Sequence, residues 1–164
     1  MKNKGEILAS ILQDYKECFF FLHNTKEFSV VEKIMNEGFI FENQLPHSTD
    51  RVNANEPIEI TYFLFQRKDY GQFTMIIAIP REIYEKYSSV SNNFDTGIEE
   101  VMTITDPYFG DNDELMYKIS PKHVLGYYNT RTSEFFRNVN WDPRFDNCLW
   151  RKPTKRRVKP DREE

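Results

Sequence analysis

The clearest pattern of hydrophobic and polar positions lies in the segment 18–39. A short apolar run from Phe19 to Leu22 predicts a strand, and His23 stands at its end. The next residues, 26–37, predict a helix because apolar side chains recur there at helical spacing. Those apolar positions are Val30, Val31, Ile34 and Met35. Gly38 is expected to end the helix, since glycine adopts a left-handed conformation without a Cβ clash.

Further elements follow from the same kind of pattern. Residues 5–17 predict a short amphipathic helix. The segment Ile58–Phe65 is rich in β-branched and aromatic residues and predicts a strand. The nearly continuous apolar run Phe73–Ile79 predicts a central strand that is buried on both faces. The other predicted elements are a short strand at Phe39–Leu45, a short helix at 81–87, strands at Glu99–Thr105 and 114–119, and a strand or turn at 123–128.

The polar segments between these elements predict connections. Residues 46–57 form a predicted loop with turn-forming residues at both ends, and Arg67–Gly71 forms a predicted turn. The pattern fades from Arg131 onward. Residues 151–164 are basic, contain two prolines and have almost no apolar side chains, which is typical of a flexible tail. We therefore expect one α+β domain over residues 1–150 and a separate tail over 151–164.

Composition narrows the possible functions. The net charge of −4 argues against general electrostatic capture of nucleic acid. The two cysteines and three histidines have no metal-ligand spacing, so no metal site is expected. With six glycines in the chain, a phosphate-cradling glycine loop is a poor interpretation. No signal-peptide pattern or membrane-length apolar run is present, which favours a cytoplasmic protein with no membrane partner.

Two segments resemble motifs of the ADP-ribosyltransferase superfamily. The first, CFFFLHNTKEFSVVEKIMNEGF, resembles the motif in which a strand ends in His-Gly-Ser/Thr and a helix closes on Gly-Phe, with Asn24 here in place of the glycine. The second, DELMYKISPKHVLGYY, resembles the motif in which a glutamate opens a strand that leads into a proline turn. The resemblance covers residues 18–128 and implies a split, twisted β-sheet of ADP-ribosyltransferase type with a few short helices. It also implies transfer of ADP-ribose from NAD to a protein or nucleic-acid acceptor, with release of nicotinamide.

The resemblance implies roles for residues around the nicotinamide ribose of NAD. His23 would hydrogen-bond a ribose hydroxyl, with Asn24 beside it, and Thr25 would cap the next helix or contact the same nucleotide. Glu114 would be the catalytic carboxylate, because cleavage of the nicotinamide bond passes through an oxocarbenium-like state that a carboxylate stabilises. Glu99 and Glu100 also open an apolar run and compete for this role.

The middle motif of the superfamily is a tyrosine that stacks on nicotinamide, and two residues here compete for it. Tyr62 and Tyr70 both lie in the segment ITYFLFQRKDYGQF. In the same segment Arg67 would contact a phosphate or ribose, since a guanidinium binds anions through paired hydrogen bonds. The polar loop with His47 and the Asp50-Arg51 pair lies where this superfamily often covers the nucleotide.

Simpler interpretations stand beside these roles. His23 could only end a strand, each tyrosine could pack in the sheet, and Arg67 could sit in a solvated turn. Two other functions on the same fold remain open. One is an NAD-dependent RNA 2′-phosphotransferase, which the acidic balance opposes. The other is a catalytically silent binding module that contacts a partner through the basic segment Arg151–Lys159.

Overall fold

The computed structural model describes residues 2–15, 18–42, 50–82, 108–109, 111–113 and 115–145. The helices are α1 (Lys4–Leu12), α2 (Phe28–Glu37) and α3 (Pro57–Gln66), and the short 3₁₀ helices are η1 (Lys68–Tyr70), η2 (Pro121–His123) and η3 (Pro143–Phe145). The strands are β1 (Cys18–Thr25), β2 (Phe39–Glu42), β3 (Asp50–Val52), β4 (Phe73–Pro80), β5 (Tyr108–Phe109), β6 (Leu115–Ile119), β7 (Val124–Asn129) and β8 (Glu134–Arg137).

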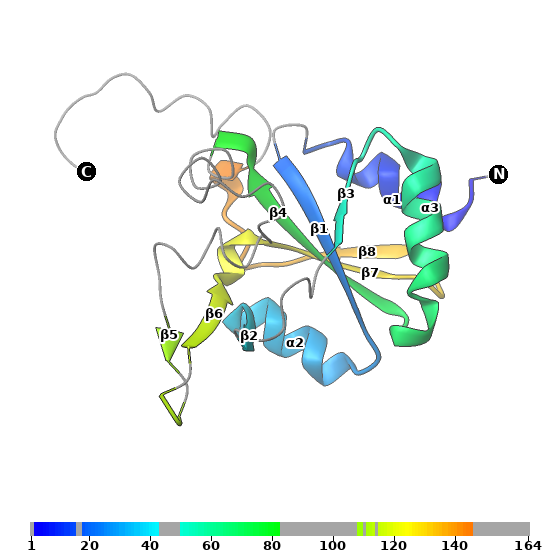
Figure 1. The fold of residues 1–164 in the computed structure, drawn as a ribbon. Helices are drawn as coiled ribbons and strands as arrows, with labels where there is room; N and C mark the ends of the chain where they lie inside the picture. Colours follow the sequence, from blue (N-terminus) through cyan, green and yellow to red (C-terminus); the bar gives the residue numbers. More distant parts are fainter. Residues whose placement is uncertain are drawn as a thin grey trace, which may run out of the picture.

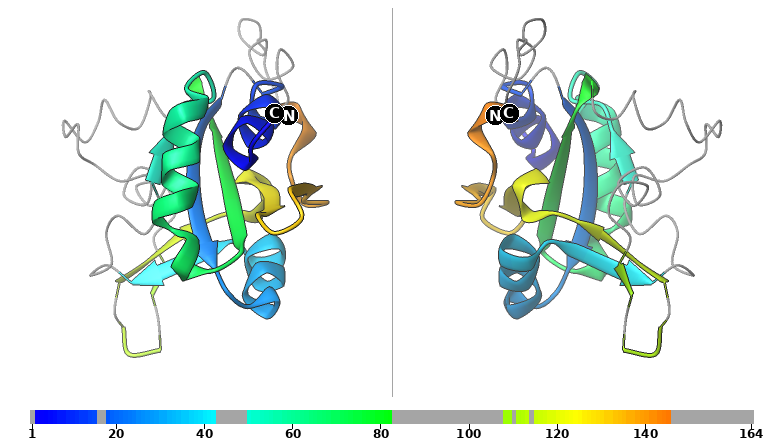
Figure 2. Two further views of the ribbon diagram at one scale, coloured as in Figure 1. Left: turned by 90° about the vertical axis from the view of Figure 1, so that its right-hand side faces the viewer. Right: turned by 90° about the vertical axis from the view of Figure 1, so that its left-hand side faces the viewer.

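These strands form two antiparallel sheets. The larger sheet has the order β3-β1-β4-β7-β8, and the smaller one has the order β2-β6-β5. Figure 1 shows β1 and β4 crossing the centre of the molecule, with α1 and α3 together at one side and α2 beside β2. In Figure 2 the smaller sheet extends away from the larger one. The mixed composition confirms the predicted α+β class.

The core has two parts, one on each face of the larger sheet. Helices α1 and α3 pack on one face against Phe20, Leu22 and Ile76. Helix α2 packs on the other face against Phe21 and Ile77. Successive side chains of a strand point to opposite faces, so neighbouring residues of β1 and β4 enter different clusters. The prediction that the Phe73–Ile79 strand is central and buried on both faces is confirmed.

Helix α2 confirms the predicted helix and its glycine stop, but its start differs. Gly38 follows the helix with a φ of 95°, in the region that favours glycine. The strand before it does not end at His23, because β1 continues through Thr25 while pairing with Thr74 and Phe73 of β4. Glu27 is the N-cap residue and has no side-chain capping bond. The predicted capping role of Thr25 is therefore wrong.

Helix α3 overturns the predicted strand at Ile58–Phe65. Proline at the first helical position fits the start of this helix, because its missing N–H would have no partner there. Its buried residues, Ile60, Phe63 and Leu64, have helical spacing. Ile58, Tyr62 and Phe65 occupy the outer face and are exposed. The apolar run thus combines two faces of one helix, and this masked the helical period.

Three edge strands appear where no strand was predicted. Strand β3 falls inside the predicted loop 46–57, β5 lies between the predicted strands Glu99–Thr105 and 114–119, and β8 follows the point where the pattern fades. The predicted strand Glu99–Thr105, with Glu99 and Glu100, lies outside the described residues, as does the tail 151–164. Only residues 81 and 82 of the predicted helix 81–87 are described. Within the described ranges, no helix has the length and apolar character needed to cross a membrane.

Candidate functional site

A pocket at one end of the β1–β3 edge gathers several of the residues predicted for NAD binding. Its volume is about 300 Å³. The residues that line the pocket are Leu22, His23, Asn24, Asp50, Phe63, Arg67 and Tyr70, and we call it the His23 pocket.

The edge of the larger sheet explains where the His23 pocket lies. Strand β3 pairs with β1 only from Phe20 to Leu22. Strand β1 continues through Thr25 and is paired there with β4. The end of α3 and the start of η1 bring Phe63, Arg67 and Tyr70 to this part of β1. The pocket is therefore built from three separate stretches of the chain.

His23 lies half-buried in the wall of the pocket. It is paired with Met75 of β4, which fixes its backbone within the sheet. Its ring meets the ring of Phe39 edge to face, with 4.8 Å between the centroids and 61° between the planes. An aromatic pair of this geometry limits the orientations of the imidazole. The sheet thus fixes the backbone of His23, and Phe39 contacts its ring on one side.

Asn24 has a structural task within the same pocket. Its Nδ2 donates to the carbonyl oxygen of Gly71 at 3.1 Å and to that of Arg67 at 3.4 Å. Its Oδ1 accepts from Thr74 Oγ1 at 3.1 Å. A glycine at position 24 would make none of these bonds. The asparagine that departs from the superfamily motif therefore ties the α3–η1 turn to β1 and β4.

Gly71 allows this turn to approach β1 closely. Its φ is 134°, which side chains rarely adopt, and a Cβ there would overlap the carbonyl oxygen of Thr25. The predicted turn at Arg67–Gly71 is confirmed, with η1 occupying its centre. Tyr70 ends η1 with 61% of its surface exposed. The turn thus presents the phenol ring beside the pocket and in contact with solvent.

Arg67 is held by an ion pair inside the pocket. Its Nη2 lies 3.0 Å from Asp50 Oδ2, and its Nε donates to the same oxygen at 3.1 Å. The guanidinium carbon also lies 5.8 Å from the ring centroid of Phe63 and 5.9 Å from that of Tyr70. The two charged side chains are 36% and 41% exposed, so the pair contributes about 0–1 kcal/mol. An anionic ligand could displace Asp50 at little cost.

The other predicted site residues lie elsewhere or are not described. Thr25 and Tyr62 are not among the described residues that line the His23 pocket. Tyr62 projects from the outer face of α3 and is 61% exposed. Glu114 and His47 lie outside the described residues. Four predicted residues therefore share one pocket, namely His23, Asn24, Arg67 and Tyr70.

Sequence reasoning assigned no site role to Phe63, and it named Asp50 only as part of a polar loop. Asp50 belongs to β3, whose pairing with Leu22 brings its carboxylate to the pocket. Phe63 points inward from α3, and the residue pattern of this segment predicted a strand instead of a helix. Correct recognition of the helical spacing of Ile60, Phe63 and Leu64 would have revealed Phe63 as an inward-facing residue.

His123 differs from His23 in its surroundings. It is 2% exposed, and burial, together with the charge of Lys122, lowers its pKa to about 3, although Asp142 acts in the opposite direction. The imidazole is therefore neutral at physiological pH. A buried, neutral imidazole of this kind is typical of a structural residue. Among the described residues, no cluster of three or more His, Cys, Asp or Glu side chains could hold a metal ion.

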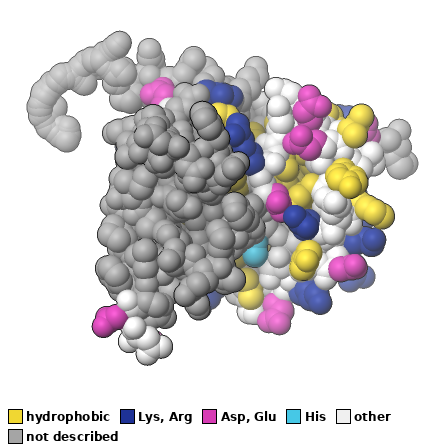
Figure 3. Space-filling model, in the orientation of Figure 1, with side chains coloured by type: hydrophobic (Ala, Val, Ile, Leu, Met, Phe, Trp, Pro, Cys, Tyr) yellow, Lys and Arg dark blue, Asp and Glu magenta, His cyan; other side chains and the backbone are white. Residues whose placement is uncertain are grey.

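The described part of the surface in Figure 3 mixes charges of both signs with hydrophobic side chains. No family model, curated protein or solved structure matches this chain.

Proposed function

We propose that this protein is an NAD-dependent ADP-ribosyltransferase-like enzyme, with the two sheets forming the split sheet of that superfamily. It transfers ADP-ribose to a macromolecular acceptor and releases nicotinamide. The observation that carries this proposal is the shared pocket of His23, Asn24, Arg67 and Tyr70. These residues come from segments more than forty positions apart, as the Asn24–Arg67 hydrogen bond illustrates.

The pocket offers the contacts that such a ligand needs. His23 provides ring nitrogens for a ribose hydroxyl, and Tyr70 provides an aromatic surface for a flat heteroaromatic ring. Arg67 provides a guanidinium for a phosphate, which would compete with its exposed partner Asp50. The volume of about 300 Å³ is at the lower end of the range for small-molecule sites.

Cleavage of the bond between ribose and nicotinamide would depend on a carboxylate. Glu114, outside the described residues, would stabilise the positive charge that develops on the ribose as the bond to nicotinamide breaks. Nicotinamide leaves with the electron pair of the bond that breaks. The acceptor then supplies the electron pair for the new bond and loses its proton to a base.

A second candidate is a binding module that holds a ligand without turnover. Two observations favour it. All three hydrogen bonds of the Asn24 side chain join parts of the protein, and Arg67 is paired with Asp50. The two candidates predict the same pocket and differ only in NAD consumption.

NAD labelled in its adenylate phosphate distinguishes these functions. The full chain is incubated with the label in a cell lysate, and label is then separated into protein, nucleic acid and small molecules. We expect the label to enter one macromolecular fraction, and we expect nicotinamide to be released as a small molecule. NAD binding without nicotinamide release would support the binding module. Absence of both binding and release would contradict both candidates.

A further inference from the structure

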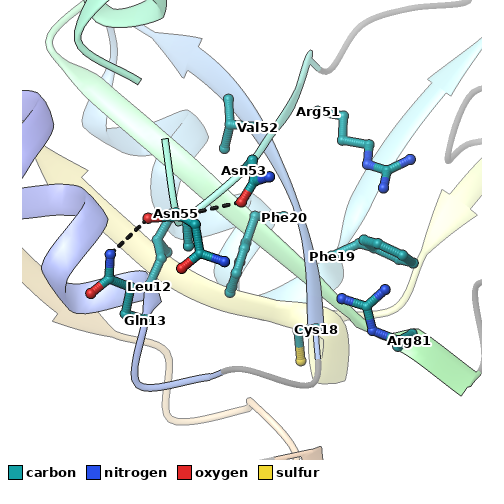
Figure 4. Close-up of a pocket in the computed structure, with 11 residues that line it drawn as sticks. Leu12, Gln13, Cys18, Phe19, Phe20, Arg51, Val52, Asn53, Asn55 and Arg81 are labelled. Atoms are coloured by element: carbon teal, nitrogen blue, oxygen red, sulfur yellow. Dashed lines mark hydrogen bonds between the residues drawn. The ribbon is translucent and has the colours of Figure 1, made fainter. Parts of the chain in front are cut away.

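A second pocket lies farther along the β1–β3 edge and contains two arginines. Its volume is about 390 Å³, and Figure 4 shows its lining. The residues are Leu12, Gln13, Cys18, Phe19, Phe20, Arg51, Val52, Asn53, Ala54, Asn55 and Arg81, and we call it the Phe19 pocket. None of these described lining residues carries a carboxylate.

The sheet register brings Phe19 and the two arginines together. Arg51 of β3 is paired with Phe21, two positions from Phe19 on the same face of β1. Phe19 is paired with Ile79 of β4, and Arg81 follows Ile79 by two positions. Diagonal neighbours on a sheet are within reach of long side chains. Three residues from separate parts of the sequence thus meet near the start of β1.

The Phe19 ring holds both guanidinium groups. The guanidinium carbon of Arg51 lies 4.1 Å from the ring centroid, and that of Arg81 lies 4.4 Å from it. Figure 4 shows the two arginines on either side of the ring. A cation–π contact of this kind contributes about 0.5–1 kcal/mol at an exposed site. The ring therefore limits the freedom of both side chains before any ligand arrives.

This arrangement suits an anion with several oxygens. A guanidinium carries its N–H donors around its planar edge, in a geometry that matches the oxygens of a phosphate. An anion with several oxygens that lies beside the edge of the Phe19 ring could reach both guanidinium groups. The opposite wall is polar and internally bonded, with Gln13 Nε2 donating to the carbonyl of Ala54 at 2.9 Å and Asn55 N donating to Asn53 Oδ1 at 2.8 Å.

We propose that the Phe19 pocket binds a phosphate group through Arg51 and Arg81, with Phe19 positioning both guanidiniums. Its volume leaves space beyond the phosphate for part of a nucleotide. The site is independent of the proposed NAD chemistry, because none of these three residues lines the His23 pocket.

Inorganic pyrophosphate titrated into the ¹⁵N-labelled full chain tests this site. We expect amide shifts at Arg51, Asn53 and Arg81, and a dissociation constant about tenfold higher in Arg51→Gln and in Arg81→Gln. Arg131→Gln is the matched control, since that exposed arginine hydrogen-bonds Gln72 outside the pocket. Equal weakening in the control, or unchanged affinity in both pocket variants, would overturn the proposal.

Two further variants separate the parts of the argument. Phe19→Leu keeps an apolar side chain but removes the ring, so we expect weaker pyrophosphate binding by a few-fold; unchanged affinity would overturn the positioning role. His23→Ala should leave the pyrophosphate affinity of the Phe19 pocket unchanged, which keeps this test distinct from that of the NAD proposal. An equal loss in His23→Ala would overturn the independence of the two pockets.

The source of the phosphate is resolved with AMP and a short single-stranded oligonucleotide. Tighter binding of AMP, lost in both arginine variants, would assign the pocket to a free nucleotide. Tighter binding of the oligonucleotide with the same losses would assign it to nucleic acid. Both results support a phosphate site, whereas binding of either ligand without dependence on Arg51 and Arg81 contradicts it.

Discussion

The two pockets on the β1–β3 edge hold their arginines in different ways. In the His23 pocket, Arg67 is paired with the carboxylate of Asp50. In the Phe19 pocket, Arg51 and Arg81 are held by an aromatic ring, and no described lining residue is acidic. A carboxylate neutralises the charge of a guanidinium, whereas a cation–π contact with a ring orients the group.

This difference suggests a division of labour. The Phe19 pocket favours tight, charge-driven recognition of phosphate. The His23 pocket is nearly neutral and offers one histidine, one tyrosine and one paired arginine, which suits the sugar and ring portions of a ligand. Asp50 and Arg51 are successive residues of β3, so one short edge strand contributes to both environments.

The largest expected effect concerns catalysis. Glu114→Gln should reduce NAD turnover on the order of 100-fold or more, because it removes the charge that opposes the oxocarbenium ion. NAD affinity and pyrophosphate affinity should change little. Nicotinamide release and calorimetric titration measure the two quantities, with Glu37→Gln, an exposed residue at the end of α2, as the control. A loss of NAD affinity as large as the loss of turnover would contradict this role.

The stability of the folded chain at acid pH limits the pH range in which the two pockets can be compared, and the buried His123 contributes to it. His123 has its pKa lowered to about 3 in the folded chain, below the ordinary value of 6.5, so the unfolded chain binds the proton more readily. Its contribution is complete above pH 6.5 and is lost as the pH falls toward 3. Between these values, the free energy of unfolding should fall by up to about 1.4 kcal/mol per pH unit from this group.

His123→Gln removes this titration. Urea unfolding of both proteins between pH 4 and 7 should show a shallower pH dependence in the variant, whatever its overall stability. The carboxylates titrate in both proteins, so the difference between the slopes isolates His123. Parallel slopes would show that the buried imidazole does not control acid stability.

The two candidate tyrosines provide a matched pair for the His23 pocket. Tyr70 lines the pocket, Tyr62 does not, and each is 61% exposed. Tyr70→Ala should weaken NAD binding about fivefold to tenfold through loss of an aromatic contact. Tyr62→Ala should change the affinity less than about twofold. Calorimetric titration of NAD compares them, and a larger loss in Tyr62→Ala would reverse their assignment.

The smallest expected effect tests the difference between the pockets directly. Asp50→Asn removes the carboxylate beside Arg67 and should raise pyrophosphate affinity at the His23 pocket about fivefold, from about 1 kcal/mol of lost repulsion. Asp142→Asn breaks another ion pair, with Arg144 at 2.8 Å, and serves as the control. Shifted amides around His23 report the site. An equal rise in the control would indicate only a change in net charge.

The sequence predicted the elements whose signals are local. Strand β4 and helix α2 each have a regular apolar pattern, and Gly38 ends the helix as expected. Helix α3 was missed because apolar residues occupy both its buried and exposed faces. Strand β3 was missed because it has three residues, of which only Val52 is buried. Edge strands of this kind depend on their partners more than on their own pattern.

The candidate sites show the same limit. His23, Asn24, Arg67 and Tyr70 were named from a resemblance, and the fold brings them to one pocket. The contact of Phe19 with two arginines has no spacing signal, because it depends on how β1 pairs with β3 and β4. Once that register is known, the meeting of these side chains follows from the alternation of residues along each strand.

Titration of NAD into the ¹⁵N-labelled full chain tests the central claim most directly. The account predicts amide shifts that saturate together at residues of the His23 pocket, including Asn24, Asp50, Arg67 and Tyr70. Shifts confined to the Phe19 pocket, or no shifts at millimolar NAD, would contradict the assignment of the His23 pocket to NAD.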